Sequence, residues 1–335
     1  MLTFEEEKDL LNDVREGASI ALYESELEGD IGDIELNKLG FRAIQDFKLN
    51  VTYGWFKFGP APFFVDSETS GEVTTVTPRA TQEIQAAESP RIPTVDNTYR
   101  SPEEYAFYFL NDIYDEFEEA VTMDAKEYLV LFYERYAPPK YRDLYIESVR
   151  FQQDLDRLKE ASEWFEESEE QFDAIEKGLS NVYRELLQIP DLSESVEAFQ
   201  RYSRILKDVL IAANSLDELT AEQQRFIAKL VDFFYGKTWE YPALLISQDT
   251  VAGDNKNDLK KASQEDLQTL RDSYDKDVET VRKQASRFDL LPEAVEERKQ
   301  LVKDQQELPR QEDDPDTIDA WTMLSGEVIM NDECK

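Results

Sequence analysis

Apolar residues recur at helical spacing along most of the chain, and this pattern predicts a mostly α fold. Over residues 1–24 they form the broad apolar face of an amphipathic helix. A second helix is expected from Asp33, as its cap, to Phe47. Residues 51–60 are aromatic and β-branched and are bounded by glycine and proline, so we expect a short strand or an extended ribbon there.

Start and stop signals place the next elements. Ser101 and Glu104, with a proline at the first helical position between them, are typical of a helix N-terminus with a capping box. Another helix is predicted at 124–136, where a proline pair follows. Residues 66–98 are rich in Ser, Thr, Glu and Pro, which indicates a surface loop with a weak hairpin at 71–78.

The clearest periodicity lies at 151–186, where two series of positions alternate at spacings of four and three. One series is apolar throughout: Phe151, Leu158, Phe165, Phe172, Leu179 and Leu186. The other series includes Ser162, Glu169 and Glu176. The first series is therefore expected to pack tightly, whereas the second is expected to be partly solvated. The pattern favours a long antiparallel helical hairpin within the chain. A coiled-coil dimer is the alternative, for which the polar column is poorly suited.

The C-terminal part is more polar. Thr220 opens a capping box before a very apolar helix, residues 247–259 form a polar linker, and a charged helix is predicted at 263–287. The predicted organisation is an N-terminal helical and ribbon region at 1–98, a helical hairpin insertion at 99–205, helices at 206–247 that close the N-terminal domain, a charged helical extension at 260–308 and a mobile tail at 309–335.

The net charge of the chain indicates the salt conditions in which the protein is stable. Asp and Glu total 74 against 37 Lys and Arg, so the net charge is −37, while 41% of residues are hydrophobic and 12% aromatic, enough for a packed core. Self-repulsion of this size destabilises a compact state at low salt, and molar salt screens it. The simplest interpretation is a cytoplasmic protein of a halophile. A nucleic-acid mimic is the alternative.

The same charge bears on partners. Nothing supplies a basic stripe, so direct nucleic-acid binding is not expected. No run of 18 apolar residues predicts a membrane span, and the acidic amphipathic start does not resemble a signal peptide.

The residue types that are missing narrow the chemistry. The chain has no histidine, which excludes His-dependent triads, imidazole bases and His-containing zinc sites, and its one cysteine, Cys334, excludes an intrachain disulfide. Its 11 glycines form no phosphate-binding loop. Acid pairs such as Asp112 and Glu116 are expected by chance on solvated helix faces. We therefore expect that the protein is not an enzyme and that it has no catalytic residues, cofactor or bound metal. The alternative is a metal-dependent hydrolase that uses Asp and Glu alone.

Two stretches resemble a known family. Residues 34–41, with Leu36-Asn37-Lys38-Leu39, precede an aromatic ribbon at 53–62 that ends in Gly-Pro-Ala-Pro. A helix, a tyrosine-glycine break and a short helix follow at 219–246. These stretches resemble the Panacea (SocA-like) antitoxin domain. The resemblance implies a helical insertion at 99–205.

The resemblance also implies a function. An antitoxin of this kind masks a protein partner without catalysis, and the implied contact surface is the helix that carries Lys38 on its outer side, together with the ribbon. The candidate partner-binding residues are Lys38, Tyr53, Trp55, Phe56, Phe58, Gly59 and Pro60. The alternative for the aromatics is that they cover the second helix. A scaffold that self-associates through 151–186, as a homo-oligomer, is the alternative function.

Overall fold

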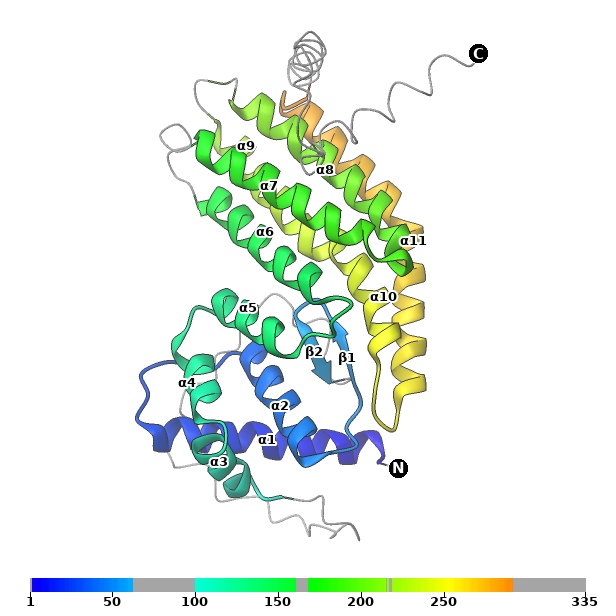
Figure 1. Cartoon of the computed structure of the whole chain (residues 1–335). Helices are drawn as coiled ribbons and strands as arrows, with labels where there is room; N and C mark the ends of the chain where they lie inside the picture. Colours follow the sequence, from blue (N-terminus) through cyan, green and yellow to red (C-terminus); the bar gives the residue numbers. More distant parts are fainter. Residues whose placement is uncertain (1, 63–99, 161–167, 215, 217–218, 292–335) are drawn as a thin grey trace, which may run out of the picture. The chain divides into compact units, whose positions relative to one another are not determined.

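The computed structural model describes residues 2–62, 100–160, 168–214, 216 and 219–291, and Figure 1 traces them. The described chain is mostly helical with one two-stranded sheet, so the predicted fold class is confirmed. Its elements are α1 (Phe4–Ser25), α2 (Asp33–Phe47), β1 (Tyr53–Phe56), β2 (Gly59–Pro62), α3 (Pro102–Asn111), α4 (Tyr114–Thr122), α5 (Ala125–Tyr136), α6 (Arg142–Glu160), α7 (Ser168–Leu187), the short η2 (Pro190–Leu192), α8 (Ser193–Asn214), α9 (Ala221–Phe233), the π-helical η3 (Phe234–Thr238), α10 (Glu240–Thr250) and α11 (Lys256–Arg287). The weak hairpin predicted at 71–78 and the tail at 309–335 lie outside the described residues.

Local signals explain where these helices begin. Thr3, Ser101 and Thr220 each form a capping box at the N-terminus of α1, α3 and α9, the last two as predicted. The expectation that Asp33 caps α2 is wrong by one residue, because Gly32 is the extended N-cap and Asp33 begins the helix. In that first turn the aspartate still complements the helix dipole.

The chain divides into two compact units, which differ from the predicted regions. Of the described residues, unit 1 comprises those within 1–150 and 239–272, and unit 2 comprises those within 151–238 and 273–291. Helices α3 to α5, predicted within the insertion, thus belong with the N-terminal region, and α8 and α9 belong with α7. Each unit contains one half of α11.

Unit 1 is held together by a close helix crossing and by the return of α10. A Cβ on Gly17 of α1 would lie 2.5 Å from the Tyr105 Cβ on α3, so the two helices approach as only glycine permits. The Trp239 indole N–H donates to the Lys57 carbonyl oxygen at 2.8 Å. Tyr53 and Ala252 exchange two backbone hydrogen bonds of 3.1 and 2.9 Å.

Unit 2 contains the predicted hairpin seam. Helices α6 and α7 lie side by side in Figure 1, and a Cβ on Gly178 of α7 would lie 2.6 Å from the Phe151 ring of α6. The seam residues Phe151, Leu155, Leu158, Leu179 and Leu186 are buried, whereas Ser162 and Phe165 lie outside the described residues. The seam therefore packs within the chain.

The charged C-terminal helix begins earlier than predicted, and it is packed. It starts at Lys256, so the polar linker is shorter than expected. In unit 2 the Tyr274 hydroxyl of α11 donates to the Ala198 carbonyl oxygen at 2.7 Å and lies 3.1 Å from the Thr238 hydroxyl. One face of this helix thus belongs to the core despite its many charges.

Candidate functional site

The ribbon predicted to bind a partner is a β-hairpin in unit 1. Its strands β1 and β2 pair antiparallel and are joined by a two-residue turn. The turn ends at Gly59, whose φ is 85°. A Cβ there would lie 2.7 Å from the Tyr133 ring, so both the backbone angle and the packing require glycine.

The aromatic residues of the ribbon point mainly inward. Trp55 is 3% exposed, and the centre of its ring lies 5.8 Å from that of Phe41 on α2 and 5.5 Å from that of Tyr145 on α6. The Tyr53 ring also meets Phe41, at 5.2 Å. Of the predicted contact residues, Trp55, Gly59 and Pro60 are buried, whereas Tyr53, Phe56 and Phe58 are half-buried. The ribbon therefore covers α2, and its outer edge alone remains accessible.

Lys38 is not on the outer side of its helix, and that expectation is wrong. The side chain is 1% exposed, its ammonium donates to the Pro60 carbonyl oxygen at 3.3 Å, and it lies 5.7 Å from the centre of the Phe132 ring. Burial lowers the pKa of Lys38 to about 7, and nearby Glu35 opposes this shift. The helix is buried on several sides because α1, α4, α5 and β2 all contact it.

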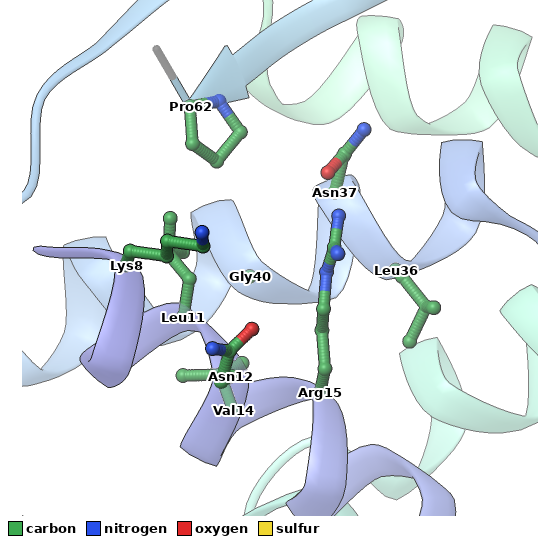
Figure 2. A pocket seen from close by; sticks show the side chains of 9 residues that line it. All are labelled: Lys8, Leu11, Asn12, Val14, Arg15, Leu36, Asn37, Gly40 and Pro62. Atoms are coloured by element: carbon green, nitrogen blue, oxygen red, sulfur yellow. The ribbon is translucent and has the colours of Figure 1, made fainter. Parts of the chain in front are cut away.

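A pocket opens beside this region, between α1, α2 and the end of β2. Its volume is about 70 Å³, enough for several water molecules. It is lined by Lys8, Leu11, Asn12, Val14, Arg15, Leu36, Asn37, Gly40 and Pro62. Figure 2 shows the polar ends of the α1 and α2 side chains directed into one space, with Pro62 across from them. Lys8 and Asn12 are exposed, so solvent reaches the pocket.

The pocket is basic and amide-rich in a chain of net charge −37. Two of its nine lining residues are cationic, and none of the nine is acidic. Within the described chain, the side chains of Lys8, Asn12, Arg15 and Asn37 make no hydrogen bond or ion pair, in contrast to cations such as Arg42, which pairs with Asp46 and Glu116 at 3.0 Å each. The site therefore presents unused donors and positive charge.

A buried carboxylate fixes the helix that carries these donors. Glu7 is 0% exposed, and it accepts hydrogen bonds from the Thr52 backbone N–H at 3.0 Å, the Thr52 hydroxyl at 2.8 Å and the Asn255 amide at 2.7 Å. These bonds set how α1 is rotated about its axis. Lys8, Asn12 and Arg15 then follow at spacings of four and three, which places them on one face toward the pocket.

Among the described residues, no group of three or more His, Cys, Asp or Glu side chains is placed to hold a metal ion. None of the helices drawn in colour in Figure 1 is both long and apolar enough to cross a membrane.

Comparison with known proteins identifies a family for this chain. A family model described as "Domain of unknown function (DUF8098)" matches residues 1–308. The chain belongs to the DUF8098 family. No curated protein and no solved structure matches it.

None of the seven contact residues predicted from the sequence lines this pocket of the DUF8098 protein. Asn37 and Pro62 lie in the two stretches singled out for the ribbon and its helix, and the fold brings both to the pocket. Lys8, Asn12 and Arg15 were missed, although their spacing in an otherwise acidic helix carries a signal. This spacing indicates a site only once α1 is known to face α2, because a polar stripe on a single helix is normally a solvated face.

Proposed function

We propose that this DUF8098 protein is a non-catalytic protein-binding protein that masks its partner in the manner of an antitoxin. The observation that carries the proposal is the pocket, where four polar side chains have no partner within the described chain. The resemblance to the Panacea (SocA-like) domain supports it, because the helix and the ribbon of the N-terminal resembling stretch both reach this pocket, through Asn37 and Pro62.

The proposed contact surface comprises the pocket and the accessible edge of the ribbon. Tyr53, Phe56 and Phe58 are half-buried, so their exposed edges can add apolar contact around the polar centre. Trp55 and Lys38 are internal, and they support this surface from beneath.

We further propose that the acidity of the chain is an adaptation to high salt in the cytoplasm. At molar salt the Debye length is about 3 Å, so charges steer a partner little from a distance. Charge contacts that become buried when a partner covers the pocket are screened much less than exposed ones. Recognition would then depend on short-range hydrogen bonds and apolar contact.

Affinity capture at molar KCl tests this function. The tagged protein is expected to retain one partner in stoichiometric amount, and Lys8→Gln/Arg15→Gln is expected to lose it. The matched control is Arg225→Gln/Lys229→Gln, which removes the same two charge types from exposed positions of α9. Recovery of the protein alone, as a monomer or homo-oligomer, would contradict the masking role.

A further inference from the structure

The pocket has the donors of an oxyanion site. The Lys8 ammonium and the Arg15 guanidinium supply positive charge, and the amides of Asn12 and Asn37 supply further N–H groups. All four side chains lie toward the same space in Figure 2, and none is engaged by another described residue. Hydrogen bonds from such charged donors to an anion are among the stronger ones in proteins.

Size and surroundings restrict which anion fits. A volume of about 70 Å³ suits a single small group. The rest of the chain carries a large excess of acid, which disfavours a long polyanion that must extend beyond the pocket. The planar fork of an arginine matches the oxygens of a carboxylate or a phosphate, and of these two the carboxylate brings the smaller negative charge into an acidic chain.

We infer that the pocket is a carboxylate-binding site that takes an Asp or Glu side chain of a protein partner. Arg15 and Lys8 hold the carboxylate, and Asn12 and Asn37 orient it. The source of the carboxylate rests on the proposed function, whereas the site itself can be tested without any partner.

The arrangement also gives selectivity. A carboxylate placed elsewhere on this chain mostly meets acidic side chains at close range, whereas the pocket offers positive charge without an acidic neighbour among its lining residues. A partner carboxylate that docks outside the pocket would therefore lie against like charges, and this repulsion disfavours binding at other places on the surface.

The test is a titration of the full chain with acetate, exchanged for chloride at constant ionic strength. The readout is the side-chain N–H resonances of Asn12, Arg15 and Asn37. We expect saturable shifts with acetate and weaker binding of inorganic phosphate. Lys8→Gln/Arg15→Gln should bind acetate about tenfold or more weakly, while Arg225→Gln/Lys229→Gln should match the wild type.

A second variant leaves the charges in place. A Cβ on Gly40 would meet only the Leu11 side chain, at 4.0 Å, so Gly40→Leu is expected to fold and to fill the pocket. It should abolish the saturable shifts. Shifts that do not saturate, equal acetate binding in all variants, or tighter binding of phosphate than of acetate would overturn the assignment. Acetate binding without partner capture would refute the proposed function alone, and capture without acetate binding would refute this inference alone.

Discussion

Replacing Lys38 should change how the stability of the protein depends on pH. Its ammonium is 1% exposed, and burial lowers the pKa of Lys38 from 10.5 to about 7. Between these two values the unfolded chain holds a proton that the folded chain has released. Unfolding then takes up a proton, so the free energy of unfolding rises with pH across this window and levels off above the unfolded pKa.

The magnitude follows from the width of the window. One pKa unit corresponds to about 1.36 kcal/mol, which is the largest slope that one group can give per pH unit. Between pH of about 7.5 and about 9, Lys38 should therefore add about 2 kcal/mol to the free energy of unfolding. Lys38→Met removes the titrating group and keeps a side chain of similar length, so the variant should lack this rise.

Urea unfolding at constant molar KCl and several pH values measures the effect. The difference between wild type and Lys38→Met isolates the lysine, because all other titrating groups are shared. Lys48→Met is the matched control, since Lys48 is exposed at the end of the same helix and its loss should leave the slope unchanged. If the free energy of unfolding changes with pH in the same way for wild type and Lys38→Met, the proposed role of Lys38 is refuted.

Three further predictions concern the frame of the site. Gly17→Ala should destabilise the protein by about 1–3 kcal/mol because its Cβ would fall 2.5 Å from the Tyr105 Cβ. Gly40→Ala should stabilise the protein by up to about 1 kcal/mol. The two melting temperatures should therefore shift in opposite directions, and shifts in the same direction would contradict this. Glu7→Gln should lower the free energy of unfolding by about 1–3 kcal/mol, because an amide cannot accept all three hydrogen bonds, and an unchanged urea midpoint would argue against this role of Glu7. Raising KCl from low to molar concentration should raise the melting temperature, and a flat or falling curve would count against salt adaptation.

The fold class and many local elements could be predicted from the sequence because their causes are local. The Ser101 and Thr220 capping boxes depend on residues three positions apart, and both form as predicted. The ribbon was predictable as an extended aromatic segment, but its pairing as a hairpin with Gly59 at positive φ required the opposite strand.

The site was less predictable because burial is a property of the assembled fold. Lys38 was expected on the outer side of its helix because Leu36 and Leu39 mark the inner side, yet several elements surround α2 and enclose the lysine. Conversely, Arg15 looks like one charge among many, and only the packing of α1 against α2, with Pro62 of β2 close by, places it at a pocket.

The central claim is that unit 1 binds a protein partner through the pocket formed by α1, α2 and the end of β2. Its most direct test is the mass of the purified complex in molar KCl, measured by light scattering after size exclusion. The account predicts a 1:1 complex for the wild type and for Arg225→Gln/Lys229→Gln, and separate components for Lys8→Gln/Arg15→Gln. A complex of the same mass and yield with the pocket variant would contradict it.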